Sequence, residues 1–170
     1  NAPYAVATDC CTHAIELSLI LNNSKFAQCP SNTYVSIPMT FIKLGLEWSF
    51  LNDKWKDYYY ITDSIIDAAV YWQRGGYIPN SFMCLSFQFK KHLSLGRGGA
   101  ILCSNQEDYL ELKKLSYDGR VPNIPWAEQN IDTIGYHYYM TPETAKTGLD
   151  KLPGAIKEPA RTWRWADYPD

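Results

Sequence analysis

The stretch from Cys84 to Cys103 places a polar, basic loop between two apolar segments with the character of buried strands. Ser86 ends the first segment, and the lysine pair Lys90 and Lys91 lies in the loop. A glycine-rich turn then leads into the second apolar segment, Ala100–Cys103. The rest of the chain has to be arranged around this strand, loop and strand.

Lysine is an unusual residue for a loop between buried strands. Burial disfavours a charged ammonium group, and a second cation nearby does the same, so Lys90 or Lys91 is a candidate for a partly neutral amine. A neutral lysine amine is a nucleophile for carbonyl groups. An ordinary solvated loop, in which Gly96–Gly99 only turns the chain, explains the same spacing equally well.

The order of Ser86-Phe87, Lys91 and the Gly96–Ala100 turn resembles the cofactor-lysine segment of the DegT/DnrJ/EryC1/StrS aminotransferases. These are pyridoxal 5'-phosphate (PLP) enzymes of the aspartate aminotransferase fold, fold type I, and many of them aminate nucleotide-linked keto-sugars. The resemblance implies that Lys91, rather than Lys90, forms the Schiff base with the cofactor. It also implies that Ser86 holds the cofactor phosphate. Arg97 replaces the acidic residue that the family more often has between these glycines, so its role stays open.

The N-terminal segment offers a second contact for a phosphate. Tyr4–Thr8 is an expected strand and Thr12–Leu21 an expected helix, with a tight turn between them. A strand, turn and helix of this kind present backbone N–H groups to an anion, although Thr12 is at least as well explained as a helix cap. By resemblance, Cys11 and Thr12 stand where the family has Gly-Thr or Ala-Thr against the phosphate, and the cysteine narrows the room for close approach.

Two further positions gain a role from the resemblance. Tyr34 follows the expected strand Phe26–Cys29, and the family has a ring-stacking aromatic residue there. Asp67 ends an apolar segment, and an aspartate at this place keeps the cofactor ring nitrogen protonated. From the residues alone, Tyr34 is a packing residue and Asp67 a turn or helix cap. Val70 replaces the Gln or His that the family usually has three residues after this aspartate.

The segment Gly135–Met140 resembles a family segment that contains an asparagine and then an arginine. In relatives the asparagine reaches the active site of the neighbouring subunit and contacts the phosphate. His137 stands at the asparagine position and Tyr139 at the arginine position. The resemblance therefore makes His137 a cofactor contact from the partner subunit, and an ordinary surface or interface histidine is an equal alternative.

The expected strands and helices, with the resemblance, predict an α/β fold in three layers. A mixed, mostly parallel central sheet lies between helices, as a reduced version of the large domain of fold type I PLP enzymes. The segment between Glu47 and Asp67 is shorter than in the family, which predicts a smaller sheet. Residues 1–152 are the expected PLP-binding domain, ending in a helix from Pro142 to Leu152. Residues 153–170 form a tail, so the chain resembles a shortened member without the C-terminal domain.

Composition excludes several classes of protein. With 46% hydrophobic and 15% aromatic residues, the chain is expected to fold rather than to be disordered. A formal net charge of −2 without a basic run argues against nucleic acid and anionic membranes as partners. Five cysteines without a C-x-x-C pair favour buried, reduced thiols and a cytoplasmic location. Neither a membrane-spanning stretch nor a signal peptide nor a metal motif is visible in the sequence.

These observations predict a PLP-dependent aminotransferase. The expected donor is an amino acid, L-glutamate by resemblance, and the expected acceptor is a small keto compound, by resemblance a nucleotide-linked keto-sugar. Lys91 is the expected acid and base, and Asp67 supports the ring. A homodimer with shared active sites would close the site of so small a subunit. A small amino-acid or diamine transaminase and a non-catalytic binding protein stay open as alternatives, the latter because of Val70, Arg97 and Tyr139.

Overall fold

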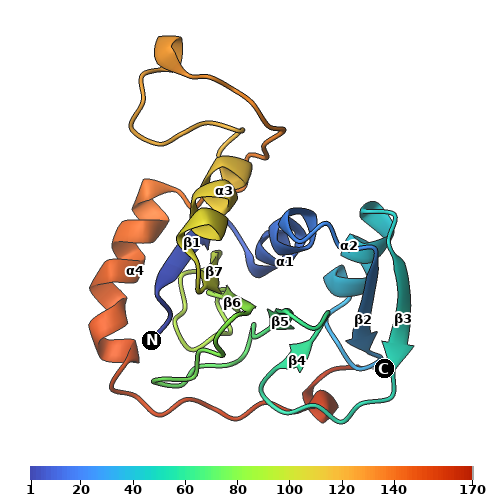
Figure 1. Cartoon of the computed structure of the whole chain (residues 1–170). Coiled ribbons are helices and arrows are strands. Elements are labelled where there is room, and N and C mark those ends of the chain that lie inside the picture. Colours follow the sequence, from blue (N-terminus) through green and yellow to red (C-terminus); the bar gives the residue numbers. More distant parts are fainter. Residues whose placement is uncertain (170) are drawn as a thin grey trace.

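A five-stranded mixed sheet forms the centre of the computed structural model, which describes residues 1–169 (Figure 1). Its strands lie in the order β1-β7-β6-β5-β4, with bounds Tyr4–Thr8, Gly99–Cys103, Phe82–Ser86, Ile65–Asp67 and Tyr59–Tyr60. Only β5 and β6 pair in parallel, and the other three neighbouring pairs are antiparallel. A separate parallel pair consists of β2 (Phe26–Pro30) and β3 (Glu47–Leu51).

The predicted α/β class and the mixed sheet are confirmed. Parallel pairing is less frequent than predicted, because β7 turns back beside β6 and inserts between β6 and β1. β1, β5 and β6 nevertheless run in the same direction. The pairing of Ser86 with Gly99 brings the two ends of the lysine loop together at the edge where β6 ends.

Helix α1 (Cys11–Leu21) is the central helix of the fold. It packs across β5, β6 and β7 and is flanked by α2 (Ser36–Lys43) and α3 (Gln106–Ser116). Because α1 is enclosed by the sheet and by two helices, it is buried on more than one face. Its residues from Ala14 to Leu19 are 1% exposed or less. Within residues 1–169, none of the helices has the length and apolarity to cross a membrane.

The opposite face of the sheet is covered by a loop. Ile66 of β5 and Met83 of β6 are buried on this face against aromatic and aliphatic side chains, among them Tyr71, Tyr77 and Ile78. This loop follows β5 and contains Gly75, which has a positive φ of 72° that disfavours helix. The loop therefore stands in place of the second helical layer that the prediction included.

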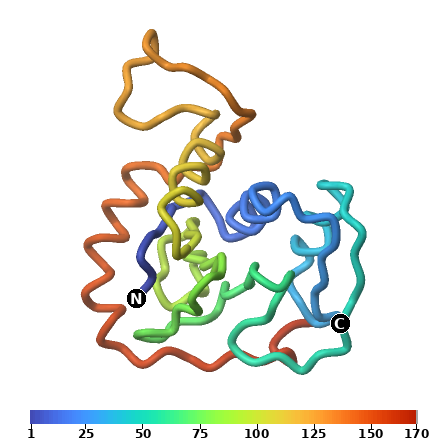
Figure 2. Tube along the Cα trace, viewed as in Figure 1, coloured from blue at the N-terminus to red at the C-terminus, as the bar shows by residue number. Residues whose placement is uncertain are grey.

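The last helix and the segment after it run around the edge of the molecule. Helix α4 spans Pro142–Ala155, three residues beyond the predicted end at Leu152, and Thr141 caps it by accepting from the Thr144 N–H. After α4 the chain runs back across the molecule (Figure 2), and the Tyr168 oxygen accepts from Nδ2 of Asn32, which follows β2. The division into a domain of residues 1–152 and a tail stays a prediction.

The cysteines fit the predicted pattern of buried thiols. All five cysteines are free, and Cys11, Cys29, Cys84 and Cys103 are buried. Burial in apolar surroundings raises the pKa of the Cys84 thiol to about 12. Cys10 differs because it is half-exposed.

Candidate functional site

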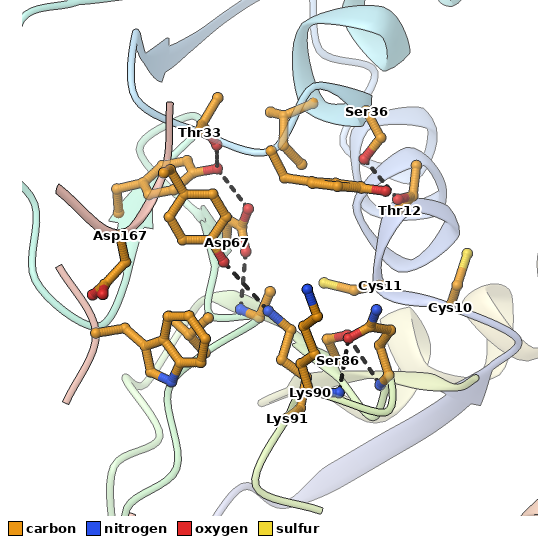
Figure 3. A pocket seen from close by; sticks show the side chains of 18 of the residues that line it. Cys10, Cys11, Thr12, Thr33, Ser36, Asp67, Ser86, Lys90, Lys91 and Asp167 are labelled. Atoms are coloured by element: carbon orange, nitrogen blue, oxygen red, sulfur yellow. Dashed lines mark hydrogen bonds between the residues drawn. The ribbon is translucent and has the colours of Figure 1, made fainter. Parts of the chain in front are cut away.

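A cavity of about 350 Å³ opens where β5 and β6 end, beside the N-terminus of α1 (Figure 3). Parallel strands end at the same edge of a sheet, so Asp67 and Ser86 arrive there together. Six of the seven residues predicted from the sequence line this cavity: Cys11, Thr12, Tyr34, Asp67, Ser86 and Lys91. The seventh, His137, does not.

Lys91 projects into the cavity from the loop after β6. The loop is folded by backbone hydrogen bonds, including those from the Lys91 N–H to the Gln88 oxygen (2.8 Å) and from the Phe87 N–H to the Gly98 oxygen (2.8 Å). Lys91 is half-buried, whereas Lys90 is exposed. Burial lowers the pKa of the Lys91 ammonium below its usual range, and the nearby carboxyl of Asp67 opposes this. A lowered pKa increases the fraction of Lys91 that is a neutral, nucleophilic amine.

Asp67 is a buried carboxyl, 6% exposed, with a defined set of donors. Its Oδ2 accepts from the Tyr59 hydroxyl (2.6 Å) and its Oδ1 from the Ala69 N–H (2.9 Å). Tyr59 can donate because it lies opposite Asp67 in the antiparallel pairing of β4 and β5. Burial raises the pKa of Asp67, while these hydrogen bonds and the charge of Lys91 favour the carboxylate. Each oxygen keeps a lone pair for a further donor.

The N-terminus of α1 forms the other end of the cavity. Cys10 is its N-cap and makes no side-chain hydrogen bond to the first turn, so amide groups there are available to an anion. Thr12 lies inside the helix, which excludes the alternative that it is the cap. Its hydroxyl shares a 2.8 Å hydrogen bond with the Ser36 hydroxyl (Figure 3).

Cys11 has a buried side chain at this end of the cavity. The thiol is buried and donates to the backbone oxygen of Cys84 at 3.4 Å. Cys11 therefore lines the cavity while its thiol is tied to β6 and lies near enough to Lys91 and Asp67 for their charges to act on its pKa. At this position the family has Gly or Ala, and this chain has the larger Cys11, whose thiol is buried.

Tyr34 and His137 are both exposed, with different placement. Tyr34 is 61% exposed and lines the cavity. His137 is 71% exposed in its side chain and lies 3.1 Å from a carboxylate oxygen of Asp118. It belongs to the region after the long loop that projects beyond α3 (Figure 1). Its contribution to a partner subunit's site stays a prediction.

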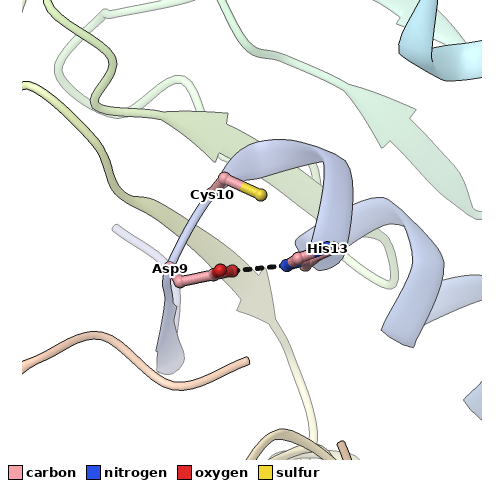
Figure 4. A group of neighbouring side chains, drawn as sticks. All are labelled: Asp9, Cys10 and His13. Carbon is pink, nitrogen blue, oxygen red and sulfur yellow. Dashed lines mark hydrogen bonds and ion pairs between the residues drawn. The ribbon is translucent and has the colours of Figure 1, made fainter. Parts of the chain in front are cut away.

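Arg97 has a role that the sequence left open. Its Nη2 lies 2.6 Å from Oδ2 of Asp9, and the other oxygen of Asp9 is 2.6 Å from Nδ1 of His13 (Figure 4). His13 in turn stacks on Tyr138 with ring centroids 3.6 Å apart. The ligand atoms of Asp9, Cys10 and His13 lie within 4.8 Å of one another, a spacing that suits a metal ion. Because Asp9 already pairs with the Arg97 guanidinium, we assign the cluster to holding the glycine turn against α1.

The His13 pair predicts a pH dependence of stability. Burial opposes protonation of His13, but its interactions with Asp9 and Cys10 together outweigh this and raise its pKa from 6.5 to about 9. A raised folded-state pKa gives stabilisation that is complete below pH 6.5 and is lost as pH rises through 9. We expect the free energy of unfolding to fall by about 1–2 kcal/mol over this window. Urea unfolding across this pH range measures it, and His13→Gln should flatten the slope; an equal slope in the variant contradicts the assignment.

Gly99 sits where the lysine loop meets the N-terminus of α1. A Cβ there would lie 2.5 Å from the Cys10 carbonyl carbon and 2.6 Å from the Cys11 nitrogen. Gly99→Ala is therefore expected to lower the free energy of unfolding by about 1–3 kcal/mol. Gly154→Ala is the matched control, since nothing lies within 4 Å of its Cβ and alanine favours helix. Urea midpoints of the two variants test this, and equal midpoints would refute the close packing.

Several lining residues carried no recognisable signal in the sequence. Trp55 and Tyr59 belong to an aromatic-rich segment, and Trp163 and Tyr168 belong to the tail. Lys91 Nζ donates to the Tyr168 hydroxyl at 3.3 Å and lies 5.2 Å from the centroid of a Trp163 ring. The abundance of aromatic residues in the tail was the one available hint that it packs against the rest of the chain.

The segment that carries the lysine loop is similar to a known protein family. The sequence profile of the DegT/DnrJ/EryC1/StrS aminotransferase family matches residues 73–166, which include the lysine loop. A search of curated proteins returned no match.

Solved structures share the fold at low sequence identity. AtS13 from Actinomadura melliaura superposes with a TM-score of 0.75 at 16% identity, covering 92% of this chain and 57% of its own. PseC from Helicobacter pylori, an aminotransferase involved in the biosynthesis of pseudoaminic acid, gives 0.71 at 14% identity, with 91% and 54% covered. NtdA from Bacillus subtilis with bound cofactor PMP gives 0.68 at 16% identity, with 91% and 45% covered. The present chain thus spans about half the length of these structures.

Proposed function

Because the chain belongs to the DegT/DnrJ/EryC1/StrS aminotransferase family, we propose that it binds PLP and transfers an amino group from an amino acid to a keto acceptor. The observation that carries this proposal is the convergence of a half-buried lysine, a buried aspartate and a helix N-terminus on one cavity. These are the three groups that PLP chemistry requires: an amine for the aldehyde, a carboxylate for the ring nitrogen and donors for the phosphate.

The residues present fit the cofactor. A cavity of about 350 Å³ lies within the range of ordinary small-molecule sites, about 300–1,000 Å³. Asp67 has free lone pairs for a protonated ring nitrogen. Thr12, Ser86 and the first-turn amides of α1 would hold the phosphate, and Tyr34 would stack on the ring. Support for these roles comes from the shared cavity and the order of the motifs along the chain.

Lys91 and Asp67 divide the catalytic work in this proposal. The cofactor, when bound, supplies an electron sink for the substrate carbon that loses its proton. Lys91, once released from covalent attachment, removes that proton as a neutral amine and returns one as an ammonium group. Asp67 keeps a proton on the ring nitrogen by offering it a buried carboxylate. The lowered pKa of Lys91 favours its neutral form, and the hydrogen bonds that Asp67 accepts from Tyr59 and Ala69 oppose the rise in pKa that burial causes there.

The proposal includes a donor, an acceptor and an oligomeric state. We expect L-glutamate as donor and a nucleotide-linked keto-sugar as acceptor. The similarity to the sugar aminotransferase CalS13 from Micromonospora echinospora supports a sugar as the acceptor. We further expect a homodimer in which His137 of one protomer contacts the phosphate at its partner's site. Donor carboxylates and nucleotide phosphates are both anions, and the exposed Lys90 in the cavity lining suits them.

The test is covalent capture of the cofactor followed by amino transfer. The full chain is mixed with PLP, the visible absorption band is recorded, and borohydride is added to fix the bond before peptide mapping by mass spectrometry. We expect the label on Lys91 and, without borohydride, loss of the band when L-glutamate is added. Keto acids, diamines and keto-sugar nucleotides then identify the acceptor. An absence of label on Lys91 would overturn the proposal, and a labelled protein that no donor converts would be a binding protein.

A further inference from the structure

The tail after α4 forms one wall of the cavity. Trp163, Asp167 and Tyr168 line it together with Lys91. These residues lie far from Lys91 in the sequence, with Tyr168 77 positions away. The wall is therefore a tertiary feature that the lysine loop does not create on its own.

Backbone hydrogen bonds fix the tail in this position. The Asp57 N–H donates to the Trp163 oxygen at 2.9 Å, and the Trp163 N–H donates to Oδ1 of Asp57 at 2.9 Å. The Trp165 N–H donates to the Trp55 oxygen at 3.1 Å. The tail thus runs beside the segment that precedes β4, held by its main chain.

Tyr168 is held within that wall from both sides. Its backbone oxygen accepts from Nδ2 of Asn32 at 3.2 Å, and its N–H donates to the Trp165 oxygen at 3.1 Å. Its ring packs on Trp55 at 5.4 Å and on Trp163 at 6.3 Å between centroids. Because both backbone and ring are anchored, the phenol oxygen has a defined place beside Lys91.

We propose that Tyr168 is a positioning residue for Lys91, whose amine its hydroxyl holds in the cavity while the Trp163 ring lies beside the same nitrogen. The contact is the 3.3 Å hydrogen bond from Nζ to the phenol oxygen. The inference rests on the proposed function in one respect, that Lys91 is the reacting amine. It adds to that function a residue of the tail that controls where the amine lies and how readily it loses its proton.

The sign of the effect follows from the hydrogen bond. A phenol oxygen that accepts from Nζ favours the ammonium form, so removing the hydroxyl while keeping the ring lowers the pKa of Lys91. Asp67 on β5, Cys11 on α1 and Lys90 in its own loop act on the pKa of Lys91, and Asp167 and Arg161 of the tail line the same cavity or the one beside it. Tyr168→Phe leaves these groups in place and keeps the packing on Trp55 and Trp163.

The experiment measures Lys91 directly, without cofactor or turnover. The full chain reacts with trinitrobenzenesulfonate over a range of pH, and the labelled Lys91 peptide is quantified by mass spectrometry. We expect the midpoint of the pH profile to move down in Tyr168→Phe, so that labelling below the midpoint is about three- to tenfold faster than in the wild type. Tyr109→Phe is the control, since Tyr109 lies on α3 outside the cavity lining.

Tyr168→Ala separates the hydroxyl from the ring. If the hydroxyl holds the amine, both Tyr168 variants shift the midpoint relative to Tyr109→Phe. A wild-type midpoint in Tyr168→Phe overturns the proposal, whether or not Tyr168→Ala differs, because the ring then acts only as filling. Failure of the proposed function is a separate result, namely no borohydride-fixed PLP on Lys91 in the wild-type chain.

Discussion

Lys91→Ala is expected to abolish covalent attachment of PLP and to lower the rate of amino transfer by about 10²- to 10⁴-fold or more. That range is the usual contribution of general acid–base catalysis alone, and the variant also loses the covalent anchor. The physical reason is position: Lys91 is the half-buried amine of the cavity, with a pKa lowered by burial. Borohydride fixation followed by peptide mapping measures the first effect, and the half-reaction with L-glutamate measures the second.

Lys90→Ala is the matched control for this experiment. The two lysines are adjacent in one loop and both line the cavity. Each variant therefore removes one lysine side chain from the same loop, and only the position of the lost amine differs. Lys90 is exposed and its Nζ lies 5.6 Å from the centroid of the Phe89 ring. We expect Lys90→Ala to keep the cofactor label. A label that persists in Lys91→Ala and disappears in Lys90→Ala would reverse the assignment.

The half of the site that could be predicted from the sequence consists of residues at the ends of local elements. Asp67 and Ser86 follow short apolar runs, and Thr12 lies in the first turn of an apolar helix, so the pattern of each segment indicated where its polar residue emerges. Parallel pairing of β5 and β6 then brings two of these ends together. The family resemblance supplied the roles, which local patterns do not contain.

The remaining part of the site depends on contacts between distant segments. Tyr168 reaches Lys91 only because the tail pairs with the chain near Asp57, and neither segment has the alternation that identifies a strand. Tyr59 reaches Asp67 through a two-residue strand, which is too short to be recognised from periodicity. Arg97 attracted notice as a departure, yet its partner Asp9 lies 88 positions away.

In the fold, too, local features could be predicted from the sequence and long-range features could not. Strands and helices began and ended within a few residues of their expected bounds because each has its own apolar pattern. The order of strands in the sheet is a global property, and the insertion of β7 between β1 and β6 left no mark in either strand. The loop that covers the sheet face containing Ile66 and Met83 could not be predicted from the sequence either, because its aromatic residues follow no regular period.

Asp67→Asn is expected to leave the cofactor label on Lys91 intact while slowing the half-reaction with L-glutamate by about 10²- to 10³-fold, the usual cost of losing one preorganised electrostatic contact. Asparagine retains an acceptor for the Ala69 N–H, so the local turn should persist. It carries no negative charge, and the ring nitrogen would then lose its proton and its capacity to draw electrons. Tyr59→Phe is the control, since it removes a neighbouring donor and keeps the carboxylate.

The role of the Asp67 charge can be separated from its role in packing by changing the cofactor. PLP methylated on the ring nitrogen carries a permanent positive charge, so it needs no carboxylate to stay cationic. In Asp67→Asn this analogue should restore much of the lost rate, whereas in Lys91→Ala it should restore none, because the missing group there is the amine. Rapid-mixing absorbance of the half-reaction measures both. A rate in Asp67→Asn that equals the wild type with ordinary PLP would show that the buried carboxyl serves the fold alone.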